Sequence, residues 1–367
     1  MTKKMIRLSG NHYEIGFQHG TQLNNVITNT VVPFVREEIN DHGISADDIG
    51  DITRRYETLL EKAFPEIIDE TRGIADGAEL DYQTALLVLL FWEVRDTASH
   101  ENHSLPDSDC SSFVAAGDAT DGDIHLATQN SDWPLRMHGK NLPQVFHISP
   151  EDRYRFIGRG LAGNLGRPSV VGFNEEGLAF VGSGIVQTKG ADFGFPPLTI
   201  TRIGLETCST VDEFVELVRK IPSWGHAGEN VDVVDKNGNM VRVSFSTKRV
   251  CTVQTKNHFL VSTNHYHNSE MSHFGPEKKE DYISTFTRYE RLVELVWENY
   301  GEINRDVAES IMSDHKYGNR PPEGNKSICR HGPLNETLCN MLSLPSKKEF
   351  WISDGTPCEG DYLKYRL

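Results

Sequence analysis

The chain of 367 residues is long enough to bury a sizeable hydrophobic core. Its 53 acidic and 37 basic residues give a formal net charge of −16, and an acidic surface repels nucleic acid and anionic membranes. We therefore expect neither as a partner. The opening MTKKMIRLSG has no apolar stretch of the kind found in signal peptides, so we expect a cytoplasmic protein.

The segment 1–98 is predicted to be mainly helical. Apolar residues recur at helical spacing over 13–25 and 49–64. Asp81 is suited to cap a helix that carries the apolar run 85–92. That run is far shorter than the roughly 20 residues that span a bilayer, and it predicts a buried core helix. The polar segment 99–109, which contains a proline, predicts an exposed loop.

Beyond residue 109 the pattern changes to short apolar segments separated by turn residues, which predicts strands. Residues 112–116 and 124–129 flank a turn at 117–122 and predict a hairpin. Further strands are predicted at 144–148, 169–173, 177–181, 231–234, 240–245, 258–262, 337–344 and 349–352, with helices at 210–220 and 282–300. This order predicts an α+β fold with packed sheets and outer helix layers.

Six cysteines are present, and no two of them have CxxC spacing. In a chain of this length the pattern indicates free thiols in a reducing compartment. Cys110 lies where the polar loop meets the first strand of the hairpin. If the chain were cut before it, the freed α-amino group, with an intrinsic pKa of about 7.7–8.0, could serve as the base for its own thiol. A core position is the alternative for a cysteine in a strand.

Two polar residues at strand ends could act with this cysteine. Asp132 ends the second hairpin strand, which in an antiparallel pair lies beside the start of the first. A carboxylate there could hold the new ammonium group; the alternative is a turn before Trp133 and Pro134. Asn264 follows the strand at 258–262, where its amide could donate to an oxyanion or close an Asx turn.

Six segments in the same order resemble those of one family, the acyl-coenzyme A:6-aminopenicillanate acyltransferases and their bacterial relatives among the N-terminal-nucleophile hydrolases. The resemblance spans nearly the whole chain. The segments are YEIGFQHG at 13–20, CSS at 110–112, QNSDW at 129–133, TNH at 263–265, SICRH at 327–331 and GTPCEG at 355–360.

The resemblance implies a four-layer αββα sandwich and self-cleavage between Asp109 and Cys110. The product chains, 1–109 and 110–367, would stay together as one structural unit. Their chemistry would act on amides or thioesters, with Cys110 as the nucleophile, Asp132 at its amino group and Asn264 in the oxyanion hole.

The resemblance also indicates the ligands. Ser111, Trp133 and His265 are the candidate substrate contacts. No cofactor or metal is expected, and the partner is a small-molecule substrate, with acyl-coenzyme A among the candidate donors. A homo-oligomer is left open, as are the acyl group, the amine and the choice between hydrolysis and acyl transfer.

The chain departs from the family pattern at two points. Asp109 precedes the expected cut, where the penicillin-making enzymes have glycine. Their active-site arginine has two candidate counterparts here, Arg330 and Arg288. We favour Arg330 because it precedes a predicted strand of the central sheet, and we interpret Arg288, on the helix 282–300, as half of a surface ion pair with a helix glutamate.

Three other interpretations compete with this one. A metal hydrolase could use the 15 histidines, in the pairs His100/His103 and His265/His267 with His273, although no HExxH motif occurs. The second alternative is a catalytically inactive binding module of the same fold, whose cleavage machinery has decayed. The GxGxxG at 158–163 lacks a clear strand–helix setting and is interpreted as a glycine-rich turn near the active-site mouth rather than as a phosphate loop.

Overall fold

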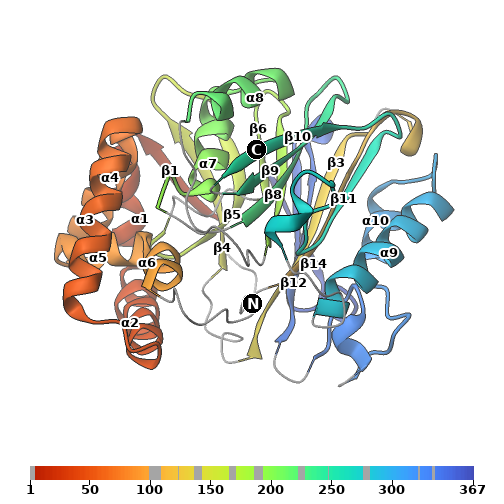
Figure 1. Ribbon diagram of the computed structural model, residues 1–367. Coiled ribbons are helices and arrows are strands. Elements are labelled where there is room, and N and C mark those ends of the chain that lie inside the picture. Colours follow the sequence, from red (N-terminus) through yellow and green to blue (C-terminus); the bar gives the residue numbers. More distant parts are fainter. Residues whose placement is uncertain are drawn as a thin grey trace.

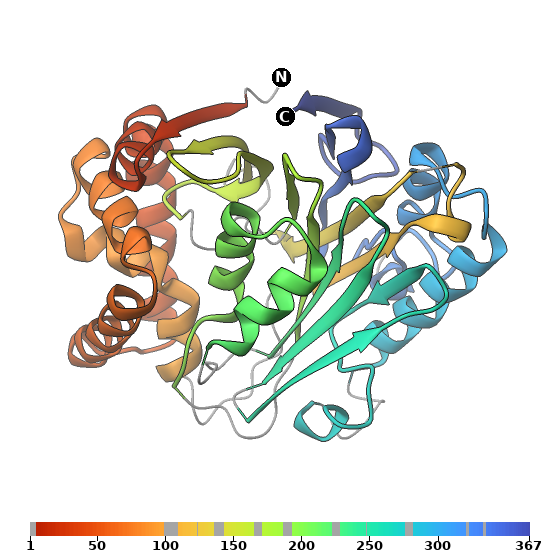
Figure 2. The ribbon, with the colours of Figure 1, turned by 90° about the horizontal axis from the view of Figure 1, so that it is seen from above.

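The protein is described here by a computed structural model. It describes residues 5–98, 109–122, 124–135, 143–164, 171–185, 193–221, 228–246, 248–275, 282–320, 323–332 and 335–367. Two sheets lie face to face between two groups of helices (Figure 1). Seen from above, the first and last strands lie close together at one edge (Figure 2).

The helices fall into an N-terminal group, a middle pair and a C-terminal pair. The N-terminal group is α1 (His12–Val26), continued through the π-helical turn Ile27–Val31 into α2 (Val32–Asp41), then α3 (Ala46–Ala63), α4 (Pro65–Gly77), α5 (Tyr82–Leu89) and α6 (Phe91–Ala98). The others are α7 (Pro197–Thr207), α8 (Val211–Arg219), α9 (Ile283–Glu298) and α10 (Arg305–Met312).

One sheet has eight strands, in the order β1 (Ile6–Gly10), β4 (Pro143–Pro150), β5 (Phe156–Leu161), β6 (Gly172–Asn174), β7 (Ala179–Ile185), β8 (Gly228–Val234), β9 (Met240–Ser246) and β10 (Arg249–Gln254). The other has six, in the order β11 (Phe259–Ser262), β2 (Asp109–Ala115), β3 (Leu126–Pro134), β12 (Asn335–Leu344), β13 (Glu349–Ser353) and β14 (Tyr362–Arg366). Only the described β1–β4 pair is parallel.

Three hydrophobic clusters lie between the four layers of the fold and pack them together. The first joins α1–α8 to the outer face of the eight-stranded sheet, for example Ile15 with Phe146. The second lies between the sheets and includes Val114 of β2 and Ile157 of β5. The third joins the six-stranded sheet to α9 and α10. The predicted αββα sandwich is therefore confirmed.

The described residues contain no helix with both the length and the hydropathy required to cross a bilayer. The apolar run 85–92 is not one helix, because the helical conformation is interrupted at Leu90, between α5 and α6. Asp81 caps α5 as predicted, and its side chain accepts from the Thr84 amide. Residues 158–161 of the GxGxxG segment belong to β5, so the interpretation of the whole segment as a turn is wrong.

The opening motif at 13–20 has a packing role. Helices α1 and α4 approach so closely that a Cβ on Gly16 would lie 2.0 Å from the Glu70 carbonyl oxygen, and one on Gly73 would lie 2.1 Å from that of Tyr13. Side chains at these positions would force the helices apart. The glycines therefore permit the contact that ties α1 to α4.

Candidate active site

The pairing of β2 with β3 sets the geometry around Cys110. In this antiparallel register Cys110 is opposite Ser131, and Asp109 is opposite Asp132. Since side chains alternate along a strand, Cys110 faces the space between the sheets, whereas Ser111 faces α9. By the same alternation Asp132, which is opposite Asp109, shares the face of Ser111, so its side chain and the thiol lie on opposite faces of the strand pair. The two residues are nevertheless close enough for the charge of Asp132 to act on the Cys110 thiol.

Gln129 connects the Cys110 thiol to the opposite sheet. Its Nε2 donates to Cys110 Sγ at 3.3 Å, and its Oε1 accepts from the Gly182 amide of β7 at 3.0 Å. Gln129 is two residues from the partner of Cys110, a diagonal position on the same face of the strand pair. The thiol is therefore held by a side chain whose own orientation is fixed by a backbone group.

Asn264 and Arg288 meet at the Cys110 backbone. The Cys110 amide donates to Asn264 Oδ1 at 3.1 Å, and Arg288 Nη2 donates to the same oxygen at 2.9 Å. Asn264 Nδ2 donates to the Gly184 carbonyl at 2.9 Å. Both neighbours of Oδ1 are obligate donors, so they fix the orientation of the Asn264 amide.

Arg288 is fully buried and contacts the residues of the candidate site directly. Its Nη1 donates to the Cys110 carbonyl at 2.6 Å and to Ser111 Oγ at 2.8 Å. The surface ion pair expected for Arg288 is therefore wrong. A helix pattern alone does not show which face of α9 packs on β2, so the buried position could not be derived from it.

Arg330 contacts the other side of the Asp109–Cys110 bond. Its Nη1 forms an ion pair with Asp109 Oδ2, and its Nε donates to Asn325 Oδ1 at 2.7 Å. Arg288 Nη2 lies 3.9 Å from the second carboxylate oxygen of Asp109. Arg330 thus pairs with the residue before the Asp109–Cys110 bond, and Arg288 donates to the residue after it.

Asp132 is completely buried and only half satisfied. Its Oδ1 accepts from Thr337 Oγ1 at 2.7 Å, while Oδ2 has no hydrogen-bond partner among the described residues. Burial raises the pKa of Asp132 to about 6, against the lowering effect of Arg288 and of the Thr337 hydroxyl. An unpaired buried carboxylate oxygen is costly, and it offers a place for a cation or donor.

The Cys110 thiol is kept protonated by its surroundings. Burial raises its pKa to about 12, and the negative charges of Asp132 and Glu229 act in the same direction. Because the thiolate is the nucleophilic form, this cysteine needs a base that takes its proton during attack.

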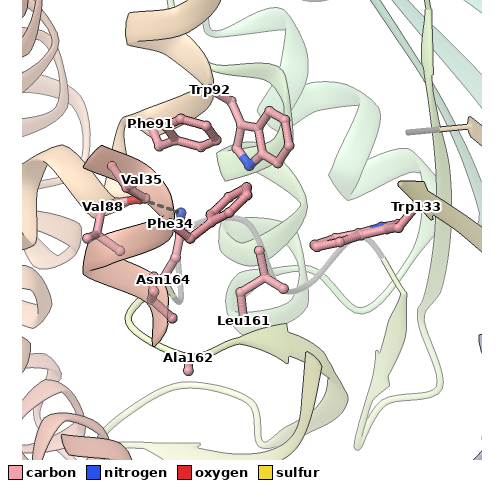
Figure 3. A pocket seen from close by; sticks show the side chains of 10 residues that line it. Phe34, Val35, Val88, Phe91, Trp92, Trp133, Leu161, Ala162 and Asn164 are labelled. Atoms are coloured by element: carbon pink, nitrogen blue, oxygen red, sulfur yellow. Dashed lines mark hydrogen bonds between the residues drawn. The ribbon is translucent and has the colours of Figure 1, made fainter. Parts of the chain in front are cut away.

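Trp133 lines a narrow apolar pocket with a free volume of about 30 Å³ (Figure 3). Phe34, Phe91 and Trp92 of the N-terminal helices form the opposite wall. Arg159 lies over the Trp133 ring at 5.0 Å, and two of its buried nitrogens, Nε and Nη2, have no hydrogen-bond partner among the described residues. Its positive charge offsets part of the rise in the pKa of the Cys110 thiol. Arg159 is therefore near both the pocket and the cysteine.

His265 has a packing environment. Its Nδ1 lies 3.0 Å from Thr285 Oγ1, and its ring contacts Phe286 and His267. His100 and His103 lie outside the described residues. Within those residues, the side chains grouped as a metal site requires are His315, Cys329, His331 and Cys358 instead. The alternative of a metal hydrolase that uses His265 and His267 therefore has no ligand cluster to support it in the described part of the chain.

Sequence reasoning missed three residues of the site as candidates: Gln129, Arg159 and Thr337. The period-2 alternation of the hairpin contained the signal for Gln129, since Gln129 and Cys110 share a face. Arg159, which reaches the site from the other sheet, belongs to the segment 158–163 that was placed near the active-site mouth, but nothing marked its side chain; no signal existed for Thr337, which reaches the site from β12.

A sequence model of the acyl-coenzyme A:6-aminopenicillanic acid acyl-transferase family matches residues 119–357. The match covers well over half of the chain, and the chain belongs to this family. Asp132, Asn264, Arg288 and Arg330 lie inside the matched range, whereas Cys110 precedes it.

An uncharacterized protein of Archaeoglobus fulgidus is 24% identical over 351 residues, which cover 84% of this chain and 57% of the relative. The chain thus spans little more than half the length of that relative.

Three solved structures are similar, with TM-scores of 0.47, 0.45 and 0.45 and identities of 16%, 12% and 16%. They are penicillin V acylase from Agrobacterium tumefaciens, a variant of conjugated bile acid hydrolase from Clostridium perfringens, and the Caenorhabditis elegans ortholog of N-acylethanolamine-hydrolyzing acid amidase. Each match covers 70% of this chain and, in that order, 86%, 97% and 100% of the other. Similarity of this degree does not indicate what this chain acts on.

The pKa of Asp132 predicts a pH-dependent effect of Asp132→Asn. Below the ordinary pKa of 3.8 the carboxyl is protonated in both folded and unfolded states. Above it the unfolded chain loses the proton first, so the native state is progressively destabilised up to pH 6. At 1.36 kcal/mol per pKa unit the full cost is about 3 kcal/mol.

The comparison uses Cys110→Ala and Cys110→Ala/Asp132→Asn, so that neither chain carries the Cys110 thiol, whose charge state would otherwise be coupled to that of Asp132. Thermal unfolding should show the double variant more stable at pH 7.5 and nearly equal to the single variant at pH 4. Equal destabilisation by Asp132→Asn at both pH values would contradict the buried, unpaired carboxylate.

Proposed function

We propose that the protein is a self-cleaving cysteine amidohydrolase or acyltransferase. It cuts the bond between Asp109 and Cys110 and then uses the freed Cys110 on a small N-acyl amide or acyl thioester. The observation that carries the proposal is the meeting of the Cys110 backbone nitrogen, Asn264 and Arg288 at one oxygen atom. The nitrogen held there is the one that would become the new α-amino group.

Self-cleavage begins when Cys110 Sγ bonds to the carbonyl carbon of Asp109. The C–N bond to Cys110 breaks, the nitrogen takes the proton that the thiol loses, and a thioester links the two residues. Water then hydrolyses the thioester, which leaves a carboxylate on Asp109 and a free thiol and amine on Cys110. The Arg330 and Arg288 contacts hold the flanking residues in place for this attack.

In turnover the α-amino group takes the thiol proton as Sγ attacks the substrate carbonyl carbon. The departing amine or thiol receives that proton, and an acyl thioester forms on Cys110. Water or an acceptor amine then releases the acyl group and restores the thiol. The unpaired Asp132 Oδ2 is suited to accept from the α-ammonium, and the second hydrogen of Asn264 Nδ2 is suited to the oxyanion.

The apolar walls of the pocket beside Trp133 are suited to an apolar acyl group, and its free volume of about 30 Å³ means that the wall side chains would have to move apart to admit one. Its walls come from both sides of the proposed cut, since Phe34 and Trp92 precede Cys110 and Trp133 follows it. The first hydrophobic cluster likewise joins residues 6–94 to the strands that follow the cut. Both features support the retention of residues 1–109 after cleavage. Ser111 and His265 remain candidates for orienting the substrate indirectly, through Arg288 and the turn that carries Asn264.

The nucleophile is tested by cysteine variants. Cys110→Ala should abolish both the cut and turnover, because no other group can form the thioester. Cys110→Ser should still cut, but slowly, because its hydroxyl can make the same acyl shift. Cys208→Ala is the control. It removes a buried thiol on the far side of the eight-stranded sheet and should leave both the cut and turnover unchanged. The measurements are gel analysis of the purified protein and turnover of a panel of N-acyl amines and acyl thioesters.

Labelling provides an independent check on the same assignment. Iodoacetamide should inactivate the processed enzyme in proportion to the label on Cys110. If the loss of activity instead followed the label on Cys251 or Cys358, the nucleophile would have been assigned to the wrong thiol.

The arginines are separated by the pH dependence of the rate. Arg288 contacts Asn264 and the Cys110 carbonyl, so its charge should lower the pKa of the new ammonium group. Arg288→Met should raise that pKa and shift the acidic limb of the kcat profile of the processed enzyme to higher pH.

Arg330→Met is the matched control, since Arg330 pairs with the far side of the cut. It should slow self-cleavage and leave the acidic limb in place. A shift of the limb with Arg330→Met alone would reverse the two assignments.

A further inference from the structure

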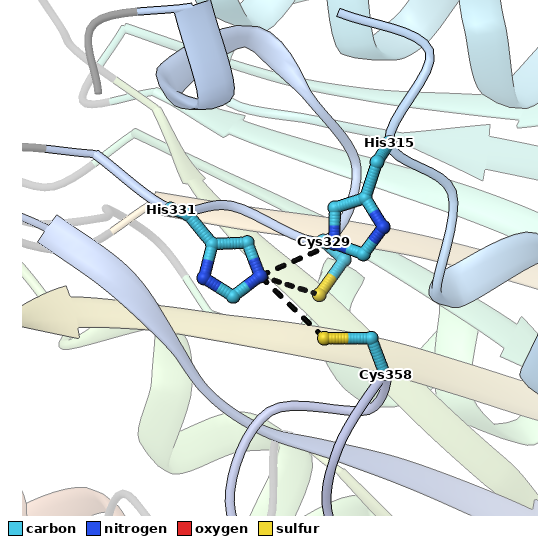
Figure 4. Close-up of side chains that lie close together, drawn as sticks. All are labelled: His315, Cys329, His331 and Cys358. Atoms are coloured by element: carbon cyan, nitrogen blue, oxygen red, sulfur yellow. Dashed lines mark hydrogen bonds between the residues drawn. The ribbon is translucent and has the colours of Figure 1, made fainter. Parts of the chain in front are cut away.

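Four side chains outside the Cys110 site converge on one point: His315, Cys329, His331 and Cys358 (Figure 4). One candidate ligand atom from each residue, a thiol sulfur or a ring nitrogen, lies within 4.8 Å of those of the other three. They come from three segments far apart in sequence: the turn after α10, the stretch before β12, and the turn between β13 and β14.

His331 Nε2 has more close polar neighbours than one ring nitrogen can bond by hydrogen bonds. Its Nε2 lies 3.1 Å from His315 Nε2, 3.5 Å from Cys329 Sγ and 3.5 Å from Cys358 Sγ. One ring nitrogen has either one hydrogen or one in-plane lone pair, so it cannot make three well-directed hydrogen bonds at once. The convergence needs another explanation.

The distances match the edges of a zinc tetrahedron. Zn–S bonds of about 2.3 Å and Zn–N bonds of about 2.05 Å imply N···S edges of about 3.5 Å and an N···N edge of about 3.3 Å. The three measured distances agree with these edges to within a few tenths of an ångström. Two thiolates would also cancel the charge of a divalent ion, which suits the fully buried Cys329.

The other ring nitrogen of His331 is oriented as in metal-binding histidines. Its Nδ1 lies 2.8 Å from Glu336 Oε1, so it can donate to that carboxylate. Nε2 is then left with its lone pair directed at the cluster. A carboxylate that fixes the tautomer of a ligand histidine is a common second partner at zinc sites.

We propose that His315, Cys329, His331 and Cys358 bind one Zn²⁺ as a structural site. Four protein ligands leave no open position for substrate, so the metal takes no part in catalysis. Cys329 and His331 flank Arg330, whose guanidinium pairs with Asp109. The ion therefore holds both sides of Arg330 and ties this segment to the turn at Cys358. This inference does not depend on the proposed function.

Zinc content is measured by elemental analysis on protein purified without a metal-affinity tag from zinc-supplemented medium. The wild type should carry about one zinc per chain. Cys358→Ser should lose it on dialysis against a chelator, whereas Cys251→Ser, which also removes a thiol that is not buried, should keep it. Glu336→Gln should bind zinc roughly 10- to 100-fold more weakly.

A cobalt-loaded wild type tests the ligand set without any variant. It should show a thiolate-to-cobalt charge-transfer band and the visible absorption of a tetrahedral ion. Two results would overturn the proposal: wild type that takes up no zinc, or Cys358→Ser that retains as much zinc as Cys251→Ser.

Discussion

The register of β2 against β3 is the constraint on which the rest of the site depends. It sets Cys110 opposite Ser131 and Asp109 opposite Asp132, and it directs the thiol between the sheets and Ser111 toward α9. A shift by one residue would move every side chain to the other face. The register is held by burial on both faces of β2, with Val114 packed between the sheets and Phe113 packed against α9 and α10.

Charge balance is the second constraint. Asp109, Asp132, Arg288 and Arg330 gather around one peptide bond, and all but Asp109 are buried. Each arginine pairs with or lies near a carboxylate, which offsets part of the cost of burial. Cleavage would add one carboxylate and one ammonium group here, and the unpaired Asp132 Oδ2 is positioned to accept from the latter. The proposed zinc site would stabilise this arrangement because two of its ligands, Cys329 and His331, flank Arg330.

Local patterns were sufficient for most elements and for the layer order, since the apolar periodicities of α3, α8 and α9 are strong and the hairpin is short. They failed where context decides. Strands β1, β5, β10 and β14 and helices α7 and α10 were not predicted; β5, for example, contains two glycines in FIGRGL. The positions of Cys110, Asp132 and Asn264 followed from strand ends, which antiparallel pairing brings together. Arg159 and the buried face of Arg288 did not, because they depend on how one layer packs on another. The zinc ligands are spread over 44 positions without a spacing motif, so only the folded chain shows that they meet.

The central claim is that Cys110 becomes an N-terminus. Intact mass spectrometry of the purified wild type, beside Cys110→Ala, tests it most directly. The account predicts two chains in the wild type, of 109 residues and of 367 − 109 = 258 residues, the longer one beginning at Cys110, and a single chain in the variant. A wild type that turns over substrate while remaining one uncut chain of 41.3 kDa would contradict it.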